Sequence, residues 1–135
     1  MSYKIETIEG IAKVYGDKLR AAGIKSTAQL LERGKTPRGR KEVAAATGIT
    51  ETLVLKWANM CDLMRIKGVA EEYSELLEKA GVDTVKELKM RIPANLHKAM
   101  GDANAKHKLV RQLPGQKQVE SWVAQAKTMP ATMEY

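Results

Sequence analysis

The sequence predicts an all-α protein made of two tandem copies of one small helical unit. Of its 135 residues, 44% are hydrophobic but only 4% are aromatic, and Phe does not occur. A core built from Leu, Ile, Val, Ala and Met suits closely packed helices better than a β-sandwich. No stretch alternates between apolar and polar residues for long enough to predict a strand. One motif in the first half of the chain returns in the second half, which predicts an internal repeat.

The two copies of the motif align without a gap. Residues 5–24 read IETIEGIAKVYGDKLRAAGI, and residues 63–82 read LMRIKGVAEEYSELLEKAGV. The aligned pairs stand 58 positions apart and include Ile8 with Ile66, Gly10 with Gly68, Ala12 with Ala70, Tyr15 with Tyr73, and Leu19 with Leu77. Trp57 and Trp122 also hold corresponding positions on apolar helix faces, so we expect both indoles to pack in the core.

The first repeat is expected over residues 1–62. It is predicted to contain four helices, the first of which follows the turn of the motif. They cover residues 14–22, 27–33, 39–47 and 51–61. Gly23 is typical of a helix C-cap, and Ser26 or Thr27 is typical of an N-cap. The Gly48-Ile49 pair separates the last two helices.

The second repeat is expected over residues 63–128, followed by a flexible tail at 129–135. Its predicted helices cover residues 70–80, 84–91, 94–100, 102–111 and 115–128. Scattered methionines are expected to fill gaps in the core, namely Met60, Met64, Met90 and Met100. No linker rich in Gly, Ser or Pro separates the repeats, so we expect them to pack together.

The repeated turn, IEGIA in one copy and IKGVA in the other, has the chemistry of an anion site. Its glycine allows a sharp turn with φ > 0, and its apolar neighbours anchor it in the core. Outward-pointing backbone N–H groups at the following helix N-terminus form a concave site for a phosphate. Lys13 follows the first turn, and Lys67 lies inside the second. The predicted phosphate cradles are Gly10, Ile11, Ala12 and Lys13 in the first copy, and Lys67, Gly68, Val69 and Ala70 in the second.

At these residues the chain resembles the helix-hairpin-helix superfamily of SAM-like small helical bundles. It is most similar to prokaryotic tandem helix-hairpin-helix proteins with a domain of unknown function, over roughly residues 3–128. The resemblance implies paired hairpins that bind the DNA backbone across the minor groove without reading sequence. The family pattern is apolar-Gly-apolar-Gly: Gly10 and Gly68 match its first glycine, whereas Ala12 and Ala70 stand at its second.

A second candidate for nucleic acid contact is the segment RGKTPRGRK, residues 33–41, which carries five cations and no acid. Pro37 and Gly39 predict a loop that leads into a helix. Its cations could neutralise several phosphates, and Arg38, Arg40 and Lys41 are the expected contacts. The alternative is a solvated basic loop.

Residues 41–57 also match the spacing of a helix-turn-helix. The outward positions of the second helix, such as Glu51 and Thr52, are less basic and less amide-rich than is typical of a groove-reading helix. Two short helices that pack at a turn give the same spacing, so sequence-specific DNA reading is not expected.

Composition excludes several other classes. A net charge of +7 favours acidic partners, and nucleic acid first. A single cysteine rules out an intrachain disulfide, and the start MSYKIETIEG lacks an apolar signal region, so we expect a cytoplasmic protein with no membrane partner. His97 and His107 lack metal-ligand spacing and are expected at the surface, so neither a metal nor a cofactor is expected.

No catalytic residue is expected either. Metal-dependent nuclease chemistry needs clustered carboxylates, whereas the acids here sit among bases on helix faces, as in Glu75 and Glu78 near Lys79. No lysine stands out as a Schiff-base nucleophile, and Cys61 is expected to be a buried thiol. The sequence therefore predicts a non-enzymatic module that binds DNA, or RNA, through its phosphate backbone. A protein-interaction or scaffold module whose hairpins no longer bind DNA is the alternative.

Overall fold

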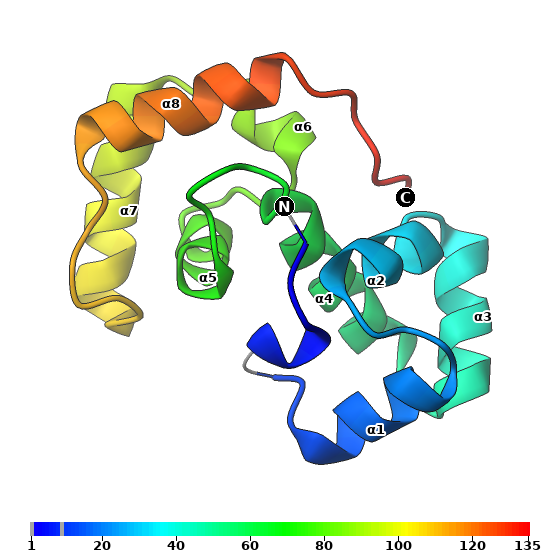
Figure 1. Ribbon diagram of the computed structural model, residues 1–135. Coiled ribbons are helices and arrows are strands. Elements are labelled where there is room, and N and C mark those ends of the chain that lie inside the picture. Colours follow the sequence, from blue (N-terminus) through cyan, green and yellow to red (C-terminus); the bar gives the residue numbers. More distant parts are fainter. Residues whose placement is uncertain (1, 9) are drawn as a thin grey trace. The chain divides into compact units, whose positions relative to one another are not determined.

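The computed structural model describes residues 2–8 and 10–135 of the chain. The described residues form eight α-helices and one 3₁₀ helix, with no strand beyond an isolated bridge between Lys4 and Ser26 (Figure 1). The predicted all-α fold is therefore confirmed. The chain divides into two compact units: unit 1 is Met1–Asp62 with Thr132–Tyr135, and unit 2 is Leu63–Ala131.

Unit 1 begins with the 3₁₀ helix η1 (Ile5–Thr7). Its α-helices are α1 (Lys13–Ala21), α2 (Thr27–Gly34), α3 (Pro37–Thr47) and α4 (Glu51–Leu63), the last of which ends at the boundary with unit 2. The Ser26 hydroxyl accepts a hydrogen bond from the Gln29 N–H at the start of α2, as its N-cap position predicts. Gly48 ends α3 in the left-handed conformation, with φ 73°.

The core of unit 1 contains an edge-to-face pair of Tyr15 and Trp57, whose ring centroids are 5.3 Å apart. Trp57 is 2% exposed, in agreement with its predicted place in the core. Apolar side chains from every element of the unit are buried as well, among them Ile5, Ile8, Ile11, Leu19, Ile24, Leu30, Val43 and Val54. The turn before α1 lies against α4, because a Cβ atom placed on Gly10 would stand 3.2 Å from Nε1 of Trp57, a residue of α4.

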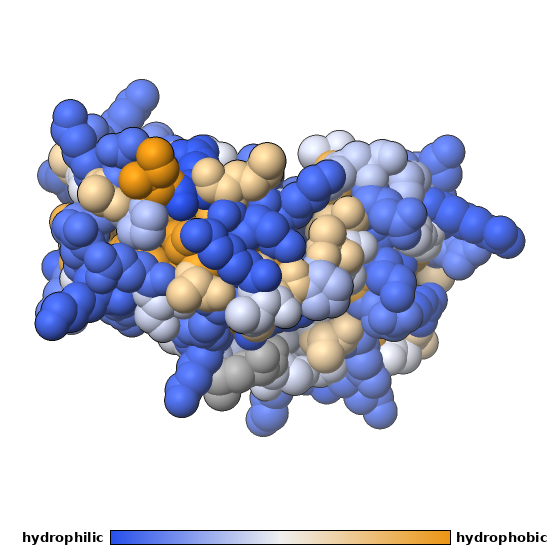
Figure 2. All heavy atoms as spheres, turned by 90° about the horizontal axis from the view of Figure 1, so that it is seen from above, coloured by the Kyte–Doolittle hydropathy of each residue, from blue (hydrophilic) through white to orange (hydrophobic). Residues whose placement is uncertain are grey.

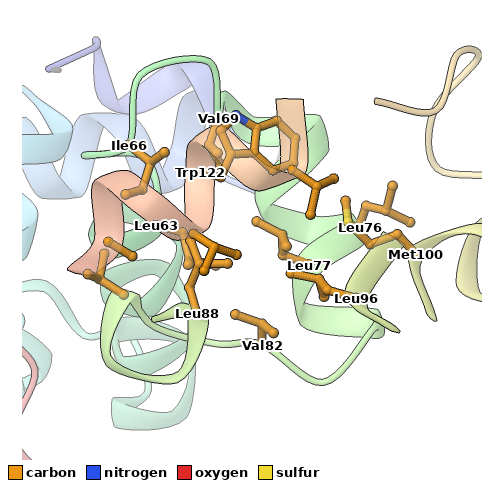
Figure 3. Packing of buried hydrophobic residues seen from close by; sticks show 14 of the residues in the cluster. Leu63, Ile66, Val69, Leu76, Leu77, Val82, Leu88, Leu96, Met100 and Trp122 are labelled. Atoms are coloured by element: carbon orange, nitrogen blue, oxygen red, sulfur yellow. The ribbon is translucent and has the colours of Figure 1, made fainter. Parts of the chain in front are cut away.

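Unit 2 contains α5 (Glu71–Lys79), α6 (Val85–Leu88), α7 (Pro93–His107) and α8 (Gln116–Lys127). Figure 3 shows its core, in which Trp122 of α8 meets Val69 of the turn and leucines of α5. Trp122 is 1% exposed, and its ring lies 5.4 Å from that of Tyr73. The turn at residues 66–70 is therefore packed on α8.

Several helix boundaries differ from prediction. The predicted helices 94–100 and 102–111 are one helix, α7, because Gly101 continues the helix and a buried stripe of Leu96, Met100 and Ala103 stabilises it. Residues 108–111 lie beyond its end. Helix α3 starts at Pro37 rather than residue 39, since proline is favoured in a first helical turn and the Thr36 hydroxyl caps the Gly39 N–H at 3.0 Å.

Two further expectations also differ from the structure. Met90 is 76% exposed and is not core filler, because α6 ends at Leu88 and leaves Met90 in the following turn. Residues 132–135 of the segment predicted as a flexible tail belong to unit 1: Met133 is 8% exposed, and the Glu134 N–H donates to the Lys35 carbonyl at 2.8 Å. The Tyr135 hydroxyl contacts the side-chain oxygen of Asn59 at 2.8 Å.

Candidate nucleic-acid interface

The glycine of each predicted cradle lies on a tryptophan ring. A Cβ atom placed on Gly10 would stand 3.2 Å from Trp57 Nε1, and one placed on Gly68 would stand 3.0 Å from Trp122 Nε1. Gly68 also has φ 96°, a conformation that residues with a Cβ rarely adopt. Close approach to the indole is thus a reason for glycine in both turns.

Each turn leads into a helix whose N-terminus has no side-chain cap. The N-cap residues are Ala12 (φ −81°, ψ −170°) for α1 and Ala70 (φ −97°, ψ −170°) for α5, and both are exposed. These φ values suit any residue, so alanine fits here without backbone strain. The first N–H groups of a helix have no intrahelical partner, and an uncapped start can offer them to an anion.

Two other residues of the predicted cradles, Ile11 and Val69, stabilise the turns themselves. The Ile11 N–H donates to the Ile8 carbonyl at 2.9 Å, and the Val69 N–H donates to the Ile66 carbonyl at 3.1 Å. Both side chains are buried, with Ile11 1% exposed and Val69 fully enclosed. Ile11 and Val69 therefore hold the turns in place and have no N–H left for a phosphate.

The Gln125 side chain clasps the second turn. Its Oε1 accepts from the Lys67 N–H at 2.9 Å, and its Nε2 donates to the Lys67 carbonyl at 3.2 Å. The backbone of Lys67 is thus occupied, and only its exposed side chain remains for an external anion.

The two helix starts differ in charge. The first turn of α1 contains no acid, and Lys13 in it forms an exposed salt bridge with Asp17 at 3.2 Å. The first turn of α5 contains Glu71, which is buried, and Glu72, which is exposed. Carboxylates there already offset the positive end of the helix dipole, so α1 is the better anion site. Glu9, which lies in the first turn motif, falls outside the described residues.

Arg40 is not a surface contact, contrary to our prediction for the basic segment. It is 6% exposed. Its Nη1 donates to the Gly34 carbonyl and its Nη2 to the Glu134 carbonyl, each at 2.9 Å, and its guanidinium lies 5.8 Å from the ring centre of Tyr135. Arg40 therefore joins the end of α2 to the C-terminal segment of unit 1.

The other cations of residues 33–41 remain at the surface, partly paired with acids that flank the segment. Lys35 lies 3.0 Å from Glu32, and Arg38, whose side chain is 91% exposed, lies 3.2 Å from Glu42. Lys41 is exposed on α3. In Figure 1 the first turn of α3 lies well away from the start of α1, so the turn and the basic segment are separate features of unit 1.

The described residues include no cluster of metal ligands and a single cysteine, which is buried. No group of three or more His, Cys, Asp or Glu residues among them could hold a metal ion. Cys61 is buried, and this burial, with the Asp62 carboxylate nearby, raises the pKa of its thiol, so it is a poor nucleophile. None of the helices in the described part of the chain is long and apolar enough to cross a membrane.

The described residues form an all-α fold with two similarly built turn–helix junctions. The chain belongs to the family described as domain of unknown function (DUF4332), whose match covers residues 9–129. No curated protein and no solved structure matches the chain.

Proposed function

We propose that this protein is a non-enzymatic module that binds the phosphate backbone of nucleic acid, DNA in the first place and RNA in the second, without reading sequence. The two units act as tandem helix-hairpin-helix repeats, and the protein works in the cytoplasm. The uncapped start of α1 at Gly10, Ala12 and Lys13 is the main phosphate contact. The exposed side chains of Arg38 and Lys41 add electrostatic attraction.

One observation carries the proposal: the same construction occurs at the start of α1 and of α5. In both, a glycine on a tryptophan ring leads into an exposed alanine and an uncapped helix N-terminus. Such a terminus favours negative charge through its N–H groups and its dipole. The net charge of +7 supports a polyanionic ligand, and hydrophilic side chains cover most of the face drawn in Figure 2.

The variant Ala12→Asp tests the site without breaking the turn. Asp is a favoured N-cap residue, so we expect α1 and the protein to gain about 1 kcal/mol of stability. Its carboxylate would stand where the phosphate binds, so we expect affinity for a labelled DNA duplex to fall about tenfold, comparable with the loss of one phosphate contact at moderate salt. Fluorescence anisotropy measures the affinity, and thermal melting measures the stability.

Ala94→Asp is the matched control, because it adds the same charge in the first turn of α7, where residue 94 is exposed. Its affinity should stay close to that of the wild-type protein. Equal losses in both variants would show an effect of net charge alone and would remove α1 as the contact. Absence of wild-type binding to duplex DNA, single-stranded DNA and RNA at low salt would overturn the proposal as a whole.

A protein-interaction or scaffold role is the second candidate, favoured by two exposed apolar side chains. Met90 and Ile92 are 76% and 63% exposed on either side of Arg91, between α6 and α7. The alanines at the second glycine position of both turns, Ala12 and Ala70, also fit a module whose hairpins no longer bind DNA. This candidate predicts no salt-dependent nucleic acid binding.

A further inference from the structure

A second basic stretch lies at the end of α7 and the start of α8, outside the repeated motif. Residues 103–119 contain four Lys and Arg residues and one histidine but no acid. The cations Lys106, Lys108, Arg111 and Lys117 are exposed, and none of them forms a salt bridge with a described residue. Four of the cations of unit 1, in contrast, are paired with carboxylates.

Asn104 holds the start of this loop from both sides. Its Oδ1 accepts from the Val110 N–H at 3.0 Å, and its Nδ2 donates to the Val110 carbonyl at 3.1 Å. Lys108 ends α7 in the left-handed conformation (φ 52°, ψ 48°), and its N–H donates to the Asn104 carbonyl. Lys108 and Arg111 are therefore carried on a backbone of fixed conformation.

Two more side chains fix the far end of the loop. The Tyr73 hydroxyl donates to the Gln112 carbonyl at 3.2 Å, and His97 Nε2 is 2.9 Å from the Pro114 carbonyl. Because Tyr73 also packs on Trp122, the loop is tied to the same aromatic pair that supports the turn before α5. Cations held in this way lose little backbone freedom when a ligand binds.

The loop and the first turn of α5 line a surface cavity of about 570 Å³ that is open to solvent. Glu72 and Tyr73 line it from α5, and Lys108, Leu109, Val110, Arg111 and Gln112 line it from the loop. Two unpaired cations thus stand beside a helix start whose own glutamates disfavour an anion. Lys108 and Arg111 outnumber Glu72 in the lining of this cavity, so the cavity favours binding of a phosphate.

We propose that the α7–α8 loop, through Lys108 and Arg111 in this cavity, is the contact by which unit 2 binds a phosphate of the nucleic acid backbone. The inference rests on the proposed function and refines it, since in unit 2 the loop replaces the turn residues Lys67–Ala70 as the principal contact. Glu72 opposes binding at this site and sets its strength.

The test is the double variant Lys108→Asn/Arg111→Gln in the full chain, because asparagine tolerates the left-handed conformation at the end of α7. Loss of two phosphate contacts should weaken binding to a labelled DNA duplex about tenfold or more and make the slope of log K against log salt shallower by about 2. The control Lys79→Gln/Lys86→Gln removes the same charge from two exposed lysines of unit 2. It should change affinity by less than about threefold, as a non-contacting charge pair does at moderate ionic strength.

Glu72→Gln supplies an opposite signal that unfolding cannot mimic, since it should raise affinity several-fold while the exposed-site control Glu120→Gln does not. Equal effects of the Lys108/Arg111 and Lys79/Lys86 pairs, with wild-type binding intact, would overturn this inference and leave the proposed function standing. No wild-type binding at low salt would overturn the proposed function and the inference with it.

Discussion

Arg20 and Glu6 form a bidentate ion pair in unit 1. Arg20 donates from Nε and Nη2 to the two carboxylate oxygens of Glu6 at 2.8 and 2.7 Å. These bonds lower the pKa of Glu6 from 4.5 to about 2 and raise the pKa of Arg20. Glu6 belongs to η1 and Arg20 to α1, so the pair ties together the two helices on either side of the first turn.

A pH dependence follows for Glu6→Gln. Because the folded-state pKa lies below the ordinary value, the stabilisation is complete above about pH 4.5 and is lost as the pH falls through about 2. Urea unfolding at several pH values should show a small stability deficit of the variant at neutral pH, as for other exposed pairs, and that deficit should vanish near pH 2. The control Glu120→Gln, in α8, should show no such convergence, and a deficit of unchanged size at pH 2 would contradict the account.

Replacement of Arg40 is expected to lower the free energy of unfolding more than replacement of Glu6. Its guanidinium donates to the Gly34 carbonyl in a buried hydrogen bond and to the Glu134 carbonyl in a partly buried one. We expect Arg40→Ala to cost about 2–3 kcal/mol, as when buried acceptors lose a charged donor, and to release the segment around Glu134 to fast hydrogen exchange. Arg38→Ala, a change at a 91% exposed side chain, is the control and should be nearly neutral. Slow exchange at Glu134 in the Arg40 variant would contradict the structural role.

At the level of elements, two helical glycines make opposite predictions for replacement by alanine. In α7 a Cβ on Gly101 would meet only Leu113 Cδ1 at 3.9 Å, so Gly101→Ala should stabilise the protein by about 1 kcal/mol. In α3 a Cβ on Gly39 would collide with the Arg33 carbonyl, so Gly39→Ala should destabilise it despite the better helix propensity. Thermal melts of the two variants should therefore shift in opposite directions, and a shared direction would show that propensity alone decides.

The same elements show how far local sequence predicts structure. Caps predicted the ends of α2 and α3, because Ser26 and Gly48 act through bonds within a few residues. The predicted break at Gly101 in α7 was wrong, since a glycine inside a helix is tolerated when the helix buries an apolar stripe. The burial of Arg40 could not be predicted, because its partner Glu134 is 94 residues away in sequence.

At the level of the whole molecule, the candidate contacts divide between the units. Unit 1 offers the start of α1 with Lys13, and Arg38 and Lys41 on α3. Unit 2 offers Lys108 and Arg111 beside the first turn of α5. The repeated motif predicts a phosphate site at both turns. The acids in the first turn of α5 and the hydrogen bonds of Gln125 to the Lys67 backbone make the second turn the less favourable of the two. The absence of acids over residues 103–119 was the available signal for the loop, and its fixed geometry is visible only in the fold.

The salt dependence of wild-type affinity for a short labelled DNA duplex tests the central claim most directly. If the five exposed cations named above contact phosphates, log K should fall linearly with log salt with a slope of about −4 to −5, at about 0.9 per phosphate. Single-stranded DNA of unrelated sequences should bind with the same sign of dependence. No binding at the lowest salt, or an affinity that does not change with salt, would contradict the account and favour a protein partner.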